Sequence, residues 1–406
     1  MTLLNPDDAT GWVTNSNQAI TIRLFSGEDV MSVEKFLKQN TTNSALSEEE
    51  CDLDIVEFHP SFTYTVFGEL EKIFGYKGLQ IYLNYAAGSL MTYLQIFYKN
   101  TVNKIETIEN VSLKVDEIEE PITKVLSSDL LHSISDFSKA VVSESIDFTP
   151  NGKKIHQYTL SNENDCVYEI YENNFSDKEF RKFHQRLQTF VIFFIEGGQF
   201  VDDTDEKWTF YTLYKKADYC GKNVYSFVGF CSVYNYFHWP DNIRARISQF
   251  LVLPPYQQSG HGSKLYNFIR QSILSNTLIV DLTVEDPNEA FDDMRDKNDI
   301  KWMLSAGNIK KLDKPLPFKD LHNLMSASKF CKKQLIRVAE LCLLKNLNNK
   351  SSKSDNFKEY RIWVKKRLFR QNYDMLIEME PEERKKKLQD TFDSVYQDYI
   401  RILSTI

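Results

Sequence analysis

The sequence lacks the features that mark several classes of protein. No apolar run among its 406 residues approaches the roughly 18 that a membrane-spanning helix needs, and the first residues show neither the basic nor the apolar segment of a secretory signal. Six cysteines are scattered without a Cys-x-x-Cys pair, and seven histidines form no His-x-x-x-His pair. We therefore expect reduced thiols in a cytosolic or nuclear protein, with neither a disulfide framework nor a metal site.

Basic residues are also outnumbered by acidic ones. The chain has 49 Lys and Arg against 57 Asp and Glu, a formal net charge of −8, which disfavours a protein whose main ligand is nucleic acid. An acidic surface suits a cationic substrate, because a cleft lined by carboxylates attracts one. The composition, 42% hydrophobic and 26% charged, is that of a globular chain long enough for two or three domains.

The common glycine motifs of nucleotide sites are missing, but another glycine turn is present. Residues 246–253 have the pattern of an apolar strand that ends at Pro254-Pro255, and Gln257-x-x-Gly260-x-Gly262 opens an amphipathic helix over residues 263–273. Such a turn gathers backbone N–H groups at a helix N-terminus, where they can bind an anion such as a pyrophosphate. The alternative is a purely structural turn.

A pair of carboxylates follows the next predicted strand. Residues 278–284 have a strand pattern, and Glu285-Asp286-Pro287 comes directly after it, where proline ends the pairing. Carboxylates at a strand end can point into a cleft and accept a proton from a substrate. The alternative is an acidic loop in which Asp286 or Asn288 caps the next helix. The glycine turn on the neighbouring strand favours the first interpretation.

The remaining patterns predict an α/β chain with a helical end. A helix is expected to begin at Ser176 or Asp177 and to run into the apolar residues 190–195, which are helix or buried strand. Pro381 suits the first turn of a last helix. Further strands are predicted at 19–25, 57–67, 79–85, 90–98, 207–214 and 225–234, and helices at 325–347 and 357–374. Residues 40–54 are expected to form an exposed loop, residues 100–122 a polar and charged segment with 115–120 at the surface, and residues 348–356 a break between helices.

Together these motifs resemble the catalytic subunits of the type B histone acetyltransferases, in the GNAT superfamily of N-acetyltransferases. The resembling blocks are residues 68–77, 193–197, 201–205, 247–263 and 284–293. The resemblance implies an α/β (α+β) fold with three parts. These are an α/β domain on the substrate side in residues 1–155, a GNAT acetyltransferase domain with a mixed sheet in residues 156–315, and a helical domain in residues 316–406.

The resemblance implies transfer of an acetyl group from acetyl-CoA to lysines in the N-terminal tail of newly made histone H4. A lysine ammonium, with a pKa of about 10.4, must lose a proton before it attacks the thioester, and a desolvated carboxylate can take that proton. Glu285 is the first candidate for this base, with Asp286 and Glu196 as further candidates. Glu196 follows an apolar run, where it is either partly buried or a solvated helix end. No cysteine lies in the Gly260 or Glu285 segments, which favours direct attack in a ternary complex.

Three parts of the chain are expected to hold acetyl-CoA. The turn 257–263 offers backbone N–H groups to the pyrophosphate, and the strand edge before it offers main-chain groups to the pantetheine and to the thioester oxygen. The resemblance adds Asn288 and Lys297. Many relatives carry Arg at the second position, and an ammonium cannot form the planar fork of a guanidinium. The predicted cofactor residues are Phe250, Leu251, Val252, Gln257, Gln258, Ser259, Gly260, His261, Gly262, Ser263, Asn288 and Lys297.

Two groups of residues are expected, again from the resemblance, to bind the Gly/Lys-rich histone tail. The first group is Glu69, Leu70 and Glu71, and the second is Tyr234, Asn235 and Tyr236. The alternative for the glutamates is an exposed helix start, where acidic residues are common. The alternative for the tyrosines is ordinary packing of a strand.

The resemblance also implies partners and a location. We expect the histone H4 tail with its histone partner and a β-propeller histone chaperone, no membrane, no primary nucleic-acid ligand, and a place in cytoplasm and nucleus. Residues 237–246, where the chaperone is expected to bind in part, look shorter than in related chains. The basic stretch 358–370 is a solvated helix face or a site for an acidic partner or DNA.

Two other functions compete with this one. The first is a catalytically weak histone-binding subunit that uses an acetyltransferase fold, which the intact glycine turn and carboxylates disfavour. The second is an acetyltransferase for small amines, which the large N-terminal region and its acidic pair disfavour.

Overall fold

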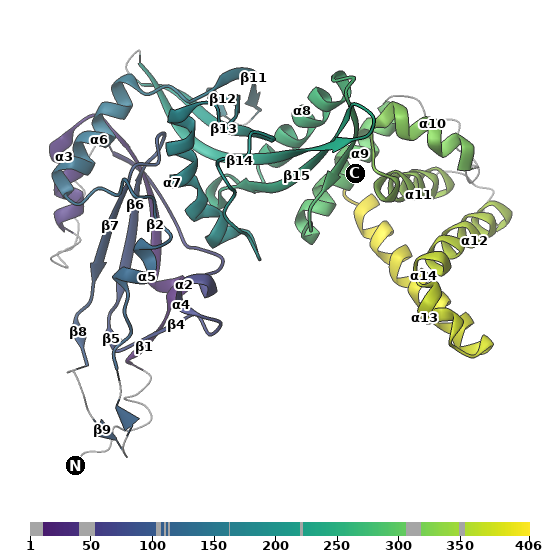
Figure 1. The fold of residues 1–406 in the computed structure, drawn as a ribbon, viewed down its shortest axis with the longest axis horizontal. Coiled ribbons are helices and arrows are strands. Elements are labelled where there is room, and N and C mark those ends of the chain that lie inside the picture. The colour runs from purple at the N-terminus through teal and green to yellow at the C-terminus, as the bar shows by residue number, and fades with distance from the viewer. Residues whose placement is uncertain are drawn as a thin grey trace. The chain divides into compact units, whose positions relative to one another are not determined.

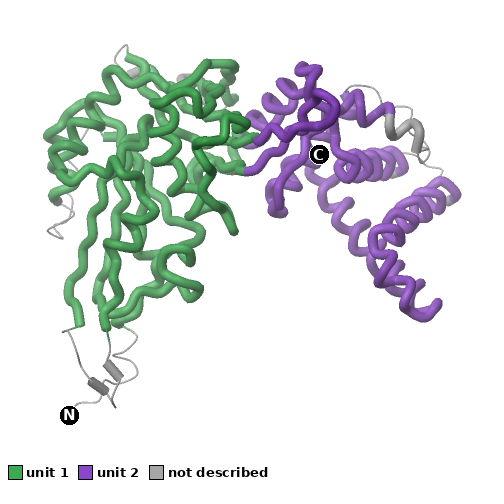
Figure 2. Tube along the Cα trace, in the orientation of Figure 1, with its two compact units in different colours: residues 1–233, 249–261 green, residues 234–248, 262–406 purple. Residues whose placement is uncertain are grey.

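The computed structural model describes residues 11–39, 53–102, 107–108, 111–112, 114–161, 163–219, 222–305, 318–348 and 354–406. The chain divides into two compact units (Figure 2). Unit 1 comprises residues 1–233 and 249–261, and unit 2 comprises residues 234–248 and 262–406. The domain boundary predicted near residue 155 falls inside unit 1. The boundary predicted near residue 315 lies outside the described residues.

Unit 1 begins with a four-stranded sheet in the order β3-β2-β6-β7 (Figure 1). Its strands are β2 (Ile20–Gly27), β3 (Leu53–Phe58), β6 (Gln80–Ala86) and β7 (Thr92–Phe97), of which β2 and β6 pair in parallel. Helices α3 (Val30–Gln39) and α6 (Ile134–Asp147) pack on one face through Val33, Leu37, Phe137 and Val141. The predicted strands at 19–25, 79–85 and 90–98 are thereby confirmed.

The predicted strand at 57–67 is wrong beyond Phe58. Pro60 has no N–H to donate to a ladder, and the next two backbone N–H groups, of Ser61 and Phe62, bond to the carbonyl of Phe193 instead of a neighbouring strand. The chain then forms the short helix α4 (Tyr64–Phe67).

Smaller elements complete this part of unit 1. They are β1 (Val13–Asn15), α2 (Ser16–Ala19), β4 (Lys72–Phe74), β5 (Tyr76–Lys77), β8 (Asn100–Thr101), β9 (Thr107–Ile108), β10 (Val111–Ser112) and α5 (Glu119–Thr123). Of the predicted loop 40–54, residues 40–52 lie outside the described residues, as do parts of 100–122 and 348–356.

A second sheet of six strands has the order β11-β12-β13-β14-β15-β16. Strands β11 (Lys153–Leu160), β12 (Glu163–Asn173) and β13 (Trp208–Tyr219) pair antiparallel, whereas β15 (Asn242–Val252) and β16 (Ile279–Val284) pair in parallel. Strand β14 (Lys222–His238) lies between β13 and β15. The predicted mixed sheet and its strands at 207–214 and 225–234 are confirmed.

Helix α7 (Lys178–Phe194) forms part of the hydrophobic core of unit 1. Its N-cap is Asp177, whose carboxylate accepts from the backbone N–H groups of Glu179 and Phe180, so the second of the two predicted caps is confirmed. Residues Phe180, Phe183, Leu187 and Phe190 are buried at helical spacing. The apolar run from residue 190 therefore forms the end of a helix and not a strand.

Unit 2 is mainly helical. Its helices are α8 (His261–Ser275), α9 (Glu289–Ser305), α10 (Phe318–Ser328), α11 (Lys332–Asn348), α12 (Ser354–Gln371), α13 (Tyr373–Ile377) and α14 (Pro381–Leu403). Pro381 occupies the first turn of α14, as predicted. The predicted continuous helix 325–347 is wrong, because it breaks at Lys329, whose φ is +52°, and the Lys329 carbonyl accepts from the N–H of Leu282 in β16.

The basic stretch 358–370 lies in α12, and one of its sides is not solvated. Tyr360, Val364 and Leu368 are buried in the core of unit 2. Arg367 forms an ion pair of 2.7 Å with the buried carboxylate of Glu340. Within the described residues, no helix has both the length and the apolar character to cross a membrane.

Candidate active site

The glycine turn has the predicted strand-turn-helix form. Strand β15 ends at Val252, the 3-10 turn η1 (Pro254–Tyr256) follows, and α8 begins at His261. Gly260 has a φ of +95°, and a Cβ there would meet no atom within 4 Å, so the backbone angle and not lack of space requires glycine. The Gln257 side chain donates to the Val252 carbonyl at 2.8 Å, which ties the turn to the strand.

The side chain of His261 faces the protein interior. It is 1% exposed, and its Nδ1 lies 2.8 Å from the Tyr158 hydroxyl, while its ring packs against that of Tyr168. Gln257, Gln258, Ser259 and Gly260 are exposed. His261 therefore fixes the start of α8, and only its backbone is placed to meet a ligand at the helix N-terminus.

A long-range contact supports the first turn of α8. The amide of Asn298 on α9 donates to the Ser263 hydroxyl at 2.9 Å and to the Met294 carbonyl at 2.7 Å, and it accepts from the amide of Asn267 at 2.7 Å. Asn298 is 8% exposed. The sequence interpretation missed it, because no local pattern links a residue in α9 to a turn so far back in the chain.

The ladder between β15 and β16 ends before β15 does. Its register runs from Ile243↔Ile279 to Ile247↔Val284, and the N–H of Glu285 closes it on the Ile247 carbonyl at 2.9 Å. Strand β15 continues to Val252, so the predicted strand edge Phe250, Leu251 and Val252 lies past the point where β16 stops. On its other side, β14 approaches closely: a Cβ at Gly229 would lie 2.4 Å from the Leu251 carbonyl.

Glu285 stands where β16 leaves β15. Its carboxylate is exposed and accepts a hydrogen bond of 2.6 Å from the hydroxyl of Ser248, a residue that the sequence interpretation did not single out. Asp286 is exposed and has a φ of +32°, an uncommon angle for a residue with a side chain. Asn288 accepts from the Phe291 N–H at 2.9 Å at the start of α9, so the capping interpretation is confirmed for Asn288.

Two other predicted site residues lie in different surroundings. Glu196 follows the end of α7 and is exposed, so the expectation of partial burial is wrong, and the solvated helix end is the structure observed. The next residue, Gly197, has a φ of +67°. Lys297 is half-buried on α9, close enough to Asp293 to help lower the pKa of that carboxyl, although the hydrogen bond from Arg401 is the larger cause.

The acidic pair of the first predicted tail group does not begin a helix. It follows the end of α4 at Phe67, so the helix-start alternative is wrong. The carboxylate of Glu71 accepts from the Asn17 amide at 2.8 Å and from the Thr63 N–H at 2.7 Å, within a turn where Glu71 has a φ of +51°. Glu69 and Leu70 are exposed, Leu70 by 78%.

The second predicted tail group lies at the end of β14. Tyr234 and Asn235 are half-buried, Tyr236 is exposed, and the two tyrosine rings make an edge contact at 4.5 Å. The guanidinium of Arg246 lies 4.8 Å from the centre of the Tyr236 ring. This group belongs to unit 2, whereas the acidic pair belongs to unit 1. No group of three or more His, Cys, Asp or Glu side chains within the described residues could hold a metal ion.

Comparison with protein families gives two matches. A model described as "Histone acetyl transferase HAT1 N-terminus" matches residues 12–196, and the "Acetyltransferase (GNAT) family" model matches residues 165–292. The second match covers β12 to β16, the glycine turn and Glu285, which identifies this part of the chain as an acetyltransferase domain.

Curated relatives match over nearly the whole chain. The type B histone acetyltransferase catalytic subunit of Cryptococcus neoformans is 36% identical, covering 97% of both chains. That of Schizosaccharomyces pombe is 33% identical over 97% of this chain and 93% of its own. The human one is 30% identical over 88% and 90%. The chain belongs to the family of type B histone acetyltransferase catalytic subunits.

Proposed function

We propose that this acetyltransferase transfers the acetyl group of acetyl-CoA to lysines in the N-terminal tail of newly made histone H4, with Glu285 as general base. One observation carries the proposal: Glu285 sits where two parallel strands part and is oriented by a hydrogen bond from Ser248. A hydroxyl donor stabilises the charged, proton-accepting form of a carboxylate. Histones are proposed as the substrate because the related proteins are histone acetyltransferase subunits.

The proposed reaction is a direct attack in a ternary complex. Glu285 accepts a proton from the lysine ammonium, and the neutral Nζ attacks the thioester carbonyl carbon. The C–S bond then breaks, and the second proton lost by the nitrogen goes to the departing sulfur, so that CoA leaves as the thiol. Because the Glu285 carboxylate is exposed in the free protein, bound acetyl-CoA and tail would supply the desolvation that strengthens it as a base. Asp286 and Glu196, both exposed as well, are the further candidates.

Acetyl-CoA is proposed to bind through backbone groups. The N-terminal turn of α8 would take the pyrophosphate, with Gln257 and Ser263 already fixed by hydrogen bonds of their own. The main chain of Phe250 to Val252 would take the pantetheine amides, since β15 runs on past its ladder with β16. Asn288 and Lys297 would contact the distal end of the cofactor.

For the histone tail, Glu69 is the better placed of the two acidic residues. Its carboxylate is exposed, whereas that of Glu71 is already engaged by Asn17 and Thr63. Leu70 would add an apolar contact beside it. In unit 2, Tyr234, Asn235 and Tyr236 would form the second contact.

A β-propeller histone chaperone and the histone that accompanies H4 are proposed as partners, with the protein in nucleus and cytoplasm. The hairpin between β14 and β15 supports such a partner, because Phe237 and Trp239 are 68% and 80% exposed there. The alternative of a catalytically weak histone-binding subunit would keep these surfaces but not require the Ser248–Glu285 pair.

The substitution Glu285→Gln tests the base. It keeps the shape of the side chain, so we expect the turnover number on a histone H4 tail peptide to fall by about 10²- to 10⁴-fold while acetyl-CoA binding stays within twofold. Glu289→Gln, an exposed glutamate at the start of α9, is the matched control and should retain full turnover. Unchanged turnover in Glu285→Gln would remove Glu285 from the mechanism and transfer the test to Asp286→Asn.

A substrate panel tests the reaction class. Labelled acetyl-CoA is supplied with histone tail peptides in one series and with polyamines in another. We expect label on the H4 tail peptide and little on polyamines. The reverse preference would support a small-amine acetyltransferase, and no transfer to either would support the histone-binding subunit.

A further inference from the structure

The loop that follows helix α7, residues 196–201, lies at the surface but is held by side chains from three elements. Glu196 and Phe200 are exposed, Phe200 by 47%. Exposed loops usually move more than the elements they connect. In this loop, backbone groups are bonded to side chains of α4, α7 and β15, which are Tyr64, Gln188 and Gln249. These bonds fix the position of the loop within unit 1.

Gln249 binds the loop to β15. It is 5% exposed, and its Nε2 donates to the Gln199 carbonyl at 2.9 Å. Its Oε1 accepts from the hydroxyl of Ser232 on β14 at 3.4 Å, and its N–H donates to the same hydroxyl at 3.0 Å. Because an amide has one donor end and one acceptor end, the contact with Ser232 directs the donor end to the loop. The preceding residue in the chain is Ser248, the partner of Glu285.

Tyr64 binds the other end of the loop to α4. Its hydroxyl accepts from the Gly197 N–H at 2.8 Å. The preceding residue, Thr63, donates its N–H to the carboxylate of Glu71 at 2.7 Å. Glu71 belongs to the turn that presents the exposed carboxylate of Glu69, the first proposed contact for the histone tail.

Together these bonds connect the proposed tail contact to β15. The connection runs from Glu71 through α4 and the loop to Gln249, and all of these residues belong to unit 1. A flexible peptide loses conformational entropy when it binds, and contacts held at a fixed separation reduce that cost only for a peptide that uses both of them. The length of the peptide should therefore reveal the role of the loop.

We propose that the loop 196–201 holds the tail contact at Glu69 at a set distance from β15, with Tyr64 and Gln249 as its positioning residues. This inference rests on the proposed function, because it requires a histone tail that binds at Glu69 while its lysine reacts beside β15. Loss of either bond would leave both contacts present but no longer at a fixed separation. A substrate that uses both contacts would then bind more weakly.

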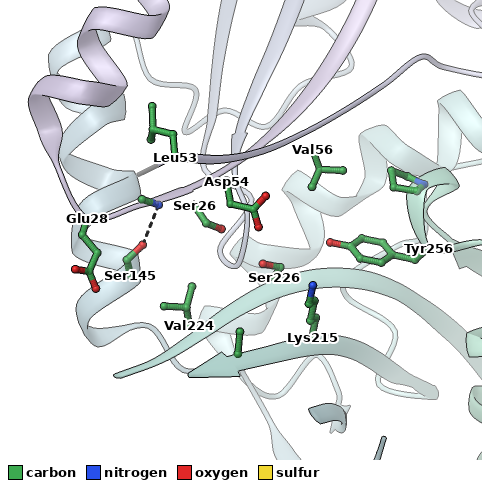
Figure 3. A pocket seen from close by; sticks show the side chains of 13 residues that line it. Ser26, Glu28, Leu53, Asp54, Val56, Ser145, Lys215, Val224, Ser226 and Tyr256 are labelled. Atoms are coloured by element: carbon green, nitrogen blue, oxygen red, sulfur yellow. Dashed lines mark hydrogen bonds between the residues drawn. The ribbon is translucent and has the colours of Figure 1, made fainter. Parts of the chain in front are cut away.

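The loop is separate from a cavity of about 560 Å³ in the same unit (Figure 3). That cavity is lined by β13, β14, α6, η1 and the ends of β2 and β3. None of its described lining residues belongs to the loop, and neither Tyr64 nor Gln249 is among them. A change in the lining of this cavity therefore cannot explain the effects of variants at these two positions.

Peptides of two lengths test the proposal. A histone H4 tail peptide can use both contacts, whereas a capped tripeptide with a central lysine spans at most about 10 Å. Tyr64→Phe removes one hydroxyl, and Gln249→Met removes the amide of a buried side chain. In each variant we expect the KM for the tail peptide to rise about five- to tenfold, the effect of one lost hydrogen bond. The KM for the tripeptide and that for acetyl-CoA should stay within twofold.

Matched variants separate positioning from stability. Gln95→Met removes another glutamine that is 5% exposed, whose amide oxygen accepts from Asn84 on β6. Tyr98→Phe removes the hydroxyl of an exposed tyrosine in unit 1. Both should keep the parent KM values for the two peptides, even where Gln95→Met lowers the melting temperature.

Two outcomes would overturn the positioning role. If the Tyr64→Phe and Gln249→Met variants raise the KM for both peptides equally, or for neither, the loop does not set the separation, while the proposed function stands. If the parent protein has the same KM for both peptides, the proposed tail contact at Glu69 is wrong, and the positioning role fails with it.

Discussion

Two carboxylates of unit 2, Glu285 and Asp299, show opposite uses of the same chemical group. The Glu285 carboxylate is exposed and accepts one hydrogen bond from the described residues, that of Ser248. Asp299 is fully buried, lies 3.3 Å from Arg270 and 3.8 Å from Arg295, and accepts from Tyr266 at 2.9 Å. Burial raises the pKa of Asp299 even though both arginines act in the opposite direction. A carboxylate with every oxygen engaged stabilises a fold, whereas one with a single partner remains available to a substrate.

Removing the charge of Asp299 should have the largest effect on stability. Asp299→Asn leaves Arg270 and Arg295 buried without their counter-charge, which costs about 3–5 kcal/mol of unfolding free energy in comparable cases. Chemical denaturation measures the loss. Glu382→Gln, which breaks an exposed pair with Lys385 on α14, is the control and should leave the unfolding midpoint unchanged. Equal unfolding free energies of the two variants would show that the buried charge of Asp299 contributes no more to stability than an exposed one.

His184, a buried side chain with no hydrogen-bond partner among the described residues, extends the comparison to pH. His184 is 0% exposed among Phe175, Phe180 and Phe210, and burial lowers its pKa to about 3. Because the unfolded chain takes up the proton near pH 6.5 and the folded chain does not, stability is lost as the pH falls from about 6.5 towards 3.

The loss attributed to His184 should reach about 2 kcal/mol at pH 5. His184→Leu removes this contribution, so the difference in unfolding free energy between pH 7.5 and pH 5 should shrink by about that amount. His132→Leu, at an exposed histidine, is the control. An identical pH dependence in parent and His184→Leu proteins would contradict the assignment.

The single hydrogen bond at Glu285 should matter for catalysis and not for stability. Ser248→Ala removes the donor, and we expect the turnover number to fall about tenfold with the melting temperature unchanged. Ser248→Thr keeps the hydroxyl and should restore most of the turnover. If alanine and threonine behave alike, Ser248 does not orient the base.

The smallest effect is expected at Asn298, a buried group that acts through the glycine turn. Asn298→Ala loses the bond to Ser263, and we expect the KM for acetyl-CoA to rise about fivefold with the turnover number within twofold. Asn267→Ala is the matched control, since Asn267 bonds to Asn298 but not to the turn. An unchanged KM would limit Asn298 to a role in folding.

Most of the fold could be predicted because its signals are local. Apolar alternation marked β6 and β7, Asp177 marked the start of α7, and Pro381 marked the start of α14. The errors fell where a distant backbone group competes with the local pattern. The carbonyl of Phe193 ends the strand at Phe58, and β16 interrupts the helix at Lys329.

The residues of the candidate site also divide into those that a local sequence pattern marks and those that only distant contacts define. Glu285 and the turn 257–263 stand out in the sequence because a strand end and a glycine turn have characteristic residues. Nothing local marks Ser248 or Asn298, whose partners lie on other elements. Glu71 looked like a free tail contact, and only the structure shows that its carboxylate holds a turn.

The sequence by itself determined the backbone plan and the family, since helix caps, strand patterns and the glycine turn depend on neighbouring residues. Tertiary structure alone decided which polar groups are used internally and which remain for ligands. Within the part of the chain that the structure describes, it gave hydrogen-bond partners to the carboxylates of Asp299 and Glu71, one partner to that of Glu285, and none to a buried oxygen of Glu28. The physical reason is that the energy of a polar group depends on its solvent exposure and on partners from distant elements, neither of which a short stretch of sequence contains.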